Sequence, residues 1–186
     1  RLAEPEARHG EIWLDHQPLH KMQAFEASQA GLGLVPEDRR IIPGLTVEEN
    51  LEMGAFIRTD DISNTMSQVY ELFPILKDKR GQPAGELSGG QRQQVAVGRA
   101  LMTEPKVLML DETTAGVSPI VMDELFDRII ELSRTGLSVL MVEQNARQAL
   151  EIADKGYVLV QGRNAYTGSG KELLSDPKVR KSFLGG

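Results

Sequence analysis

Two short segments of the sequence contain residue types that suit phosphate chemistry. In residues 87–91, Leu-Ser-Gly-Gly-Gln, a helix-capping pair, Ser88 and Gln91, encloses Gly89 and Gly90. Because glycines leave backbone N–H groups uncovered at the positive end of a helix, this segment can bind an anion such as phosphate. An ordinary capped helix has the same S-x-x-Q spacing, so the pair alone does not distinguish the two interpretations.

Two adjacent acids follow an apolar run. Residues 107–110 are Val-Leu-Met-Leu, and Asp111 and Glu112 come directly after them. Successive side chains of a strand point in opposite directions, so the two carboxylates can have different roles. Asp111 is suited to hold Mg²⁺ through water, and Glu112 to orient or deprotonate an attacking water. A strand that meets solvent at a loop often ends in acids too, which is the alternative for this segment taken alone.

The hydrophobic pattern predicts strands and helices in alternation around these segments. Helices are expected at about 22–30, 66–76, 91–102, 121–132 and 146–152, and another begins at the capping box 46–49. The apolar segments predict strands at 10–14, 32–35, 106–110 and 138–142, the last two buried on both faces, and a hairpin at 157–167. Residues 1–9 are expected to be irregular. This alternation predicts a mostly parallel sheet.

Composition narrows the classes of function. The chain has 186 residues, which is enough for one domain. No apolar run approaches the length of about 18 residues that a membrane span requires. With 21 basic and 27 acidic residues the net charge is −6, which argues against nucleic acid as a ligand. The absence of cysteine excludes disulfides, thiolate metal sites and a cysteine nucleophile.

Read at full length, residues 87–101 resemble the signature motif of ABC ATPases, and residues 107–112 resemble a Walker B motif. The resemblance implies an α/β fold, a P-loop NTPase-like ABC ATPase core with a mostly parallel sheet, flanking helices and a small helical subdomain. It implies one domain over residues 1–186. Within it we expect a helical subdomain at about 38–85, the signature, Walker B and switch region at about 86–160, and a C-terminal hairpin end and helices at about 161–186.

The resemblance also assigns roles to residues outside the two motifs. Glu37 lies at the Q-loop position and, with Asp111, would bind Mg²⁺ largely through water. Gln144 lies at the switch position and would be catalytic together with Glu112, while ATP would contact residues 88–91. The D-loop would contain Ala115, Gly116 and Ser118.

Several of these positions depart from the usual family pattern. Glu37 replaces glutamine, Thr113 replaces proline, Ser118 replaces aspartate and Gln144 replaces histidine. All three histidines lie within the first twenty residues, so no histidine can serve as the switch residue. An amide at the switch position can hydrogen-bond a γ-phosphate but carries no positive charge.

The segments 36–51, 115–119 and 142–145 are similar to the ATPase subunit of branched-chain amino acid importers. Urea or amide importers share much of the pattern and remain an alternative. The resemblance implies ATP and Mg²⁺ as cofactors and a second ABC ATPase subunit in a homo- or heterodimer. It also implies transmembrane permease subunits, contacted by residues 37–79, a periplasmic solute-binding protein acting indirectly, and a peripheral location at the cytoplasmic face of a bacterial inner membrane.

One element of the family pattern is not found. No G-x-x-x-x-G-K-S/T phosphate loop precedes Glu37. The segment 168–171 is similar, but Ala165 stands where the motif needs its first glycine, and Glu172 stands where it needs Ser or Thr. We therefore predict that this segment is a loop that enters a helix. We therefore expect the N-terminal strands and phosphate loop to be absent, apolar surface to be exposed, and the fragment alone to be inactive. A truncated sequence and a non-catalytic cassette that only donates its signature motif both account for this. ABC proteins of DNA repair or translation carry long insertions that do not fit in this chain.

Overall fold

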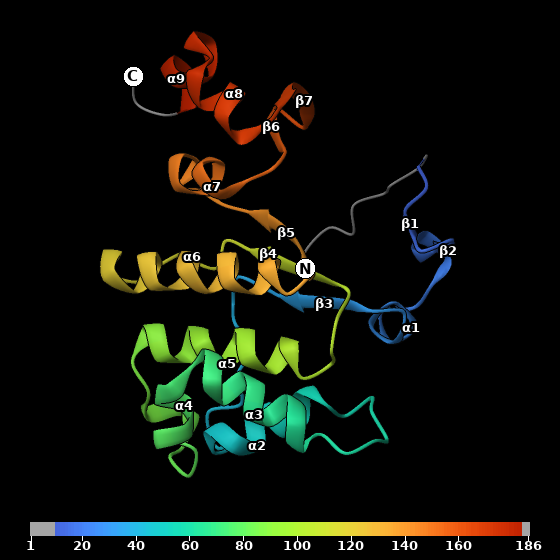
Figure 1. The fold of residues 1–186 in the computed structure, drawn as a ribbon, viewed down its shortest axis with the longest axis vertical. Coiled ribbons are helices and arrows are strands. Elements are labelled where there is room, and N and C mark those ends of the chain that lie inside the picture. The colour runs from blue at the N-terminus through green and yellow to red at the C-terminus, as the bar shows by residue number, and fades with distance from the viewer. Residues whose placement is uncertain (1–9, 184–186) are drawn as a thin grey trace.

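The centre of the molecule is a three-stranded parallel sheet, described in a computed structural model that covers residues 10–183 (Figure 1). The strands β3 (Leu32–Val35), β4 (Val107–Asp111) and β5 (Ser138–Val142) lie in the order β3-β4-β5. Both pairings are parallel, with Leu34 opposite Met109 and Met109 opposite Leu140. The predicted parallel sheet is confirmed, and the carboxyl ends of all three strands lie at the same edge.

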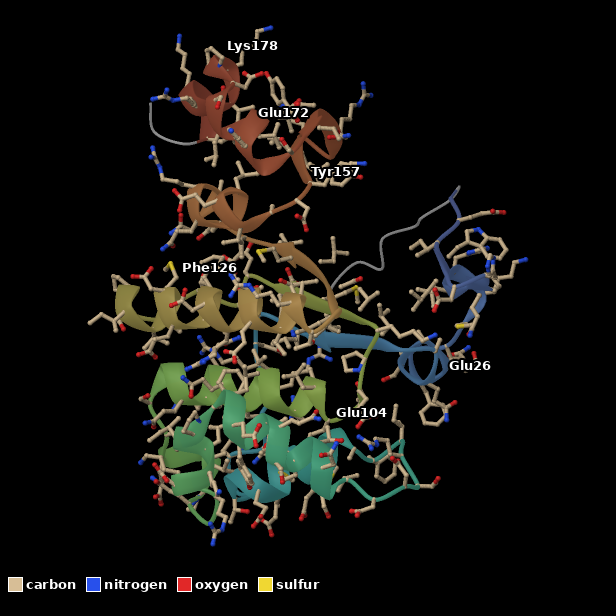
Figure 2. The ribbon with its side chains drawn as sticks, viewed as in Figure 1. Glu26, Glu104, Phe126, Tyr157, Glu172 and Lys178 are labelled. Atoms are coloured by element: carbon tan, nitrogen blue, oxygen red, sulfur yellow. The ribbon has the colours of Figure 1, made fainter. Side chains whose placement is uncertain are left out.

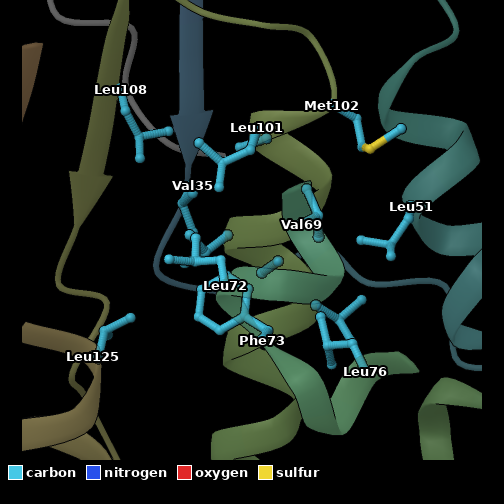
Figure 3. Close-up of a cluster of buried hydrophobic side chains, with 14 of the residues drawn as sticks. Val35, Leu51, Val69, Leu72, Phe73, Leu76, Leu101, Met102, Leu108 and Leu125 are labelled. Atoms are coloured by element: carbon cyan, nitrogen blue, oxygen red, sulfur yellow. The ribbon is translucent and has the colours of Figure 1, made fainter. Parts of the chain in front are cut away.

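Helices cover one face of the sheet. The helices α5 (Gly89–Leu101) and α6 (Pro119–Arg134) pack there, and Figure 3 shows side chains of the sheet, α5 and the neighbouring helices in one apolar cluster. Val35, Leu108 and Leu110 point to this side and are fully buried. Their burial follows from the period of two along a strand, which sends alternate residues to the same face.

A small group of helices packs on the far side of α5, within the range predicted as a helical subdomain. It consists of α2 (Val47–Gly54), α3 (Ser63–Leu72), α4 (Pro74–Asp78) and the 3-10 turn η2 (Ala84–Glu86). The predicted capping box between Thr46 and Glu49 is present, and the helical region predicted at about 66–76 divides into α3 and α4 at Pro74. A side chain at Gly98 would lie 2.9 Å from both Leu51 and Val69, so glycine lets α5 approach α2 and α3 closely.

The C-terminal elements form a separate layer beyond β5, where Tyr157, Glu172 and Lys178 lie (Figure 2). They are α7 (Ala146–Ile152), the antiparallel hairpin of β6 (Gly156–Val160) and β7 (Arg163–Gly168), α8 (Gly170–Ser175) and α9 (Pro177–Phe183). The segment 168–171 enters α8, with Ser169 as the capping residue. A side chain at Gly170 would meet backbone oxygens of Leu150 and Ala153, so this glycine serves packing on α7. The prediction of a loop that enters a helix is confirmed.

The N-terminal elements lie to one side of β3 (Figure 1). They are β1 (Trp13–Leu14), β2 (Gln17–Pro18), the 3-10 turn η1 (Leu19–Lys21) and α1 (Ala24–Gln29). The strand predicted at 10–14 is shorter than expected, because only Trp13 and Leu14 pair with another strand. Their partner is β2, which follows after a tight turn. The prediction for residues 1–9 lies outside the described part of the chain.

The second face of the sheet is open, which corrects the prediction that β4 and β5 are buried on both faces. Leu34, Leu140 and Val142 all point to this face and are 53%, 56% and 57% exposed. The physical reason is that alternate residues of a strand point to opposite faces, and the apolar cluster that the sheet forms with α5 and α6 includes none of these three side chains. The predicted exposure of apolar surface is confirmed. Among the described residues, no helix is both long and apolar enough to span a bilayer.

Candidate functional site

The polar residues predicted to act in catalysis gather at the carboxyl edge of the sheet. Glu37 follows the end of β3, Asp111 ends β4, and Gln144 follows the end of β5. The backbone N–H of Glu112 donates to the carbonyl of Val142 at 2.9 Å, which continues the pairing of β4 and β5 beyond the strand ends. The carboxyl edge of a parallel sheet is the common location of ligand sites in open α/β folds.

The two acids after β4 differ in environment. Asp111 is exposed and shares the open face with Met109, whereas Glu112 is partly buried and has a left-handed backbone with φ of 44°. A non-glycine residue in this conformation is held there by its surroundings, and such residues cluster at active sites. The chain thus turns sharply at Glu112 and gives the two carboxylates separate directions.

The acids fit a magnesium ion but do not form a complete cage for one. Within residues 10–183 there is no cluster of three or more histidine, cysteine or acidic side chains that could hold a metal. Mg²⁺ commonly keeps several waters and binds through one or two carboxylates together with substrate phosphates. Exposed carboxylates at Asp111 and Glu37 meet that requirement.

Glu143 ties the loop after β4 to the loop after β5. Its carboxylate accepts hydrogen bonds from the hydroxyl of Thr113 at 3.2 Å, the hydroxyl of Thr114 at 2.6 Å and the backbone N–H of Thr114 at 3.2 Å. Both threonines are buried. Sequence reasoning treated Thr113 only as a departure from proline and gave Glu143 no role. The available signal was the pair of hydroxyl residues, Thr113 and Thr114, after Glu112, together with an acid directly before Gln144.

The helix start at α5 has the predicted capping box. The hydroxyl of Ser88 accepts from the N–H of Gln91 at 3.3 Å, and the amide oxygen of Gln91 accepts from the N–H of Ser88 at 3.1 Å. The two glycines between them differ, however. A side chain at Gly90 would lie 2.6 Å from Val121 of α6, whereas one at Gly89 would meet only the carbonyl oxygen of Gly116, at 3.9 Å. Gly90 therefore has a steric role that sequence reasoning missed.

The predicted D-loop connects β4 to α6 and passes the start of α5. Gly116 adopts a left-handed conformation with φ of 69°, and Ser118 precedes Pro119 as the N-terminal cap of α6, without a side-chain hydrogen bond to the helix. Glycine suits the turn because it has no side chain to clash there. The carbonyl oxygen of Ala115 is bonded to Arg39, a residue for which sequence reasoning proposed no role.

Arg39 lies two residues after Glu37 and reaches two other segments. Its Nε donates to the side-chain oxygen of Gln93 at 2.6 Å, and its Nη2 donates to the carbonyl oxygen of Ala115 at 2.8 Å. Arg99 fixes the backbone on the other side by donating to the carbonyl oxygens of Arg39 and Arg40, at 3.0 Å and 2.6 Å. Burial lowers the pKa of Arg99, and the nearby charge of Arg40 lowers it further.

A cleft of about 520 Å³ opens between α1, β3, α2 and α5. Apolar side chains dominate its lining, including Ile42 and Met53, and Arg99 lies at its border. Phe56, in the turn after α2, is 79% exposed.

Comparisons with known proteins cover nearly the whole chain. The family model described as "ABC transporter" matches residues 2–115. The high-affinity branched-chain amino acid transport ATP-binding protein BraG of Pseudomonas aeruginosa is 45% identical over 183 residues, which are 98% of this chain and 78% of BraG. The probable branched-chain amino acid transport ATP-binding protein LivF of Archaeoglobus fulgidus is 36% identical over 178 residues, covering 95% and 75% of the two chains.

More distant relatives include other transport functions. The lipopolysaccharide export system ATP-binding protein LptB of Escherichia coli is 35% identical over 184 residues, covering 95% of this chain and 74% of LptB. The crystal structure of the ADP conformation of MJ1267, described as an ATP-binding cassette of an ABC transporter, has a TM-score of 0.82 at 28% identity, covering 96% and 78% of the two chains. Sequence and fold comparisons therefore agree.

Proposed function

This chain belongs to the ABC transporter family, and we propose that it is the ATP-hydrolysing subunit of an importer of branched-chain amino acids. It is an ATP-binding protein of that family, with the α/β fold of the ABC cassettes. The substrate proposal draws support from BraG and LivF, which are named as branched-chain amino acid transport proteins, and from the segments 36–51, 115–119 and 142–145.

The observation that carries the catalytic proposal is the meeting of three strand ends at one edge. Glu112 is the general base that orients or deprotonates the attacking water, and Gln144 donates its amide to the γ-phosphate. Asp111 and Glu37 would hold Mg²⁺ largely through water, and the ion would supply positive charge against the phosphates. Glu112 and Gln144 would position the nucleophile.

A second ABC ATPase subunit would complete the site. Residues 88–91 form the start of a 13-residue helix, where Ser88 is exposed, Gly89 and Gln91 are partly exposed and Gly90 is buried, and the N–H groups at this end suit a phosphate of an ATP held by the other subunit. Residues 1–186 contain no G-x-x-x-x-G-K-S/T loop, so we propose that they do not hydrolyse ATP without a phosphate loop from elsewhere.

Permease subunits would contact residues 37–79 from the membrane side, at the cytoplasmic face of a bacterial inner membrane. The cleft beside Ile42 and Met53, together with exposed Phe56, presents apolar surface within this segment. Apolar surface that remains exposed on a folded domain commonly marks a protein contact. A periplasmic solute-binding protein would act on this subunit only through the permease.

The transported solute is tested with the protein expressed from its full open reading frame and reconstituted with its permease in vesicles. ATP hydrolysis is measured with solute-binding protein loaded with leucine, isoleucine, valine or urea. We expect stimulation by the three branched-chain amino acids and none by urea. Stimulation by urea alone would overturn the substrate proposal in favour of a urea or amide importer. If none of these preparations hydrolyses ATP, the result would support the non-catalytic cassette.

A further inference from the structure

We propose that Arg39 is a positioning residue that fixes three segments of the proposed ATP site relative to one another; this inference rests on the proposed function. The segments are residues 37–39 after β3, the signature helix α5 and the loop 112–118 after β4. Arg39 belongs to the first, and it is bonded to Gln93 in the second and to Ala115 in the third. These contacts span 54 and 76 residues of sequence.

The contact with Gln93 is buried and hard to replace. Gln93 is 1% exposed, and its side-chain oxygen accepts from Arg39 while its amide nitrogen has no hydrogen-bond partner among the described residues. Removing Arg39 would leave the oxygen unpaired as well, and a buried unpaired acceptor is destabilising. The orientation of this amide, two residues past Gln91, therefore depends on Arg39.

The contact with Ala115 acts on the loop that begins at Glu112. Arg39 donates to a backbone carbonyl, so it fixes the path of the loop directly. The loop is held from the other side by Glu143, through Thr113 and Thr114. The anchored residues 113–115 lie between Glu112, which precedes them, and Gly116, which follows them beside Gly89.

The geometry requires an arginine with a restrained backbone. Two nitrogens of one planar guanidinium serve two acceptors on different elements, which a single ammonium group cannot reproduce. The backbone of Arg39 and Arg40 is left-handed, with φ of 58° and 44°, and Arg99 bonds to both carbonyl oxygens. Such a conformation persists where the surroundings hold it, which fits a role in positioning.

The test compares Arg39→Ala with the matched control Arg40→Ala in the reconstituted full-length protein. Arg40 has the same backbone conformation, but its side chain is 67% exposed. Among residues 10–183 this side chain forms hydrogen bonds only with Asp38, two residues earlier. We expect Arg39→Ala to lower kcat for ATP hydrolysis by about a hundredfold, the loss typical of a misplaced catalytic group, with little change in KM. Arg40→Ala should keep the wild-type rate.

Two further measurements separate positioning from general stability. Added guanidinium ions should restore part of the rate in Arg39→Ala, whereas Arg39→Lys should stay slow. Amide hydrogen exchange in residues 112–118 should become faster in Arg39→Ala and not in Arg40→Ala. The proposal is overturned if Arg39→Ala hydrolyses ATP at the wild-type rate, if its loss follows the fraction unfolded without guanidinium rescue, or if exchange in the loop is unchanged. If the wild-type protein does not hydrolyse ATP, the proposed function fails, and the exchange measurement still decides the role of Arg39.

Discussion

The carboxylate of Glu143 accepts a hydrogen bond from the hydroxyl of Thr114 at 2.6 Å, and this bond joins the loops that contain Glu112 and Gln144. The same carboxylate also receives the hydroxyl of Thr113 and the backbone N–H of Thr114. The loop after β4, which contains Glu112, and the loop after β5, which contains Gln144, are therefore joined by one side chain.

Replacing Glu143 with alanine should destabilise the protein. The change leaves the buried hydroxyls of Thr113 and Thr114 without their acceptor, and we expect a loss of about 1.5–3 kcal/mol in the free energy of unfolding. Urea denaturation measures it. Thr113→Val, which removes one hydroxyl and leaves the carboxylate, is the control and should cost less. An unchanged unfolding midpoint in Glu143→Ala would show that the three bonds do not contribute.

Gly90→Ala should be more destabilising than Gly89→Ala. The added methyl group at Gly90 would overlap Val121, and overpacking of this kind costs about 1–3 kcal/mol, whereas the one at Gly89 has room. Thermal unfolding of both variants compares them directly. The double variant Gly90→Ala with Val121→Ala should recover part of the loss, because it removes the group that clashes. Equal stability of the two single variants would contradict the steric role of Gly90.

The ion pair between Arg58 and Asp60 should make stability depend on pH in the acid range. Hydrogen bonds from Arg58 lower the pKa of Asp60 to about 2 from its ordinary value of 3.8. Because the folded-state pKa is the lower one, the contribution of Asp60 is complete above about pH 4 and is lost as the pH falls through 2. The difference in urea midpoint between wild type and Asp60→Asn should shrink over this interval. A difference that stays constant would rule out the ion pair as its source.

The sequence predicts local features of the fold well because they depend on neighbouring residues. The capping boxes at Thr46 and Ser88 and the hairpin after Tyr157 each need only a few adjacent residues, and all are present. The parallel order of the sheet follows from the alternation of elements in the same way.

Features that depend on distant residues could not be predicted. The bonds of Arg39 and the contact between Gly90 and Val121 join elements that the sequence gives no means of placing. Burial of β5 was predicted wrongly for a similar reason. An apolar run indicates a strand that can be covered on both faces, but whether a second layer packs on it depends on residues distant in sequence, and Leu140 and Val142 of β5 stay exposed.

ATP hydrolysis by wild type and Glu112→Gln, each expressed from the full open reading frame and reconstituted with the permease, tests the central claim most directly. Glutamine keeps the shape of Glu112 but cannot accept a proton, and loss of a general base lowers rates by about 10²–10⁴-fold. We therefore expect phosphate release by the wild type, a loss of that size in Glu112→Gln, and ATP binding by both. An undiminished rate in Glu112→Gln, or no hydrolysis by the wild type, would contradict the account.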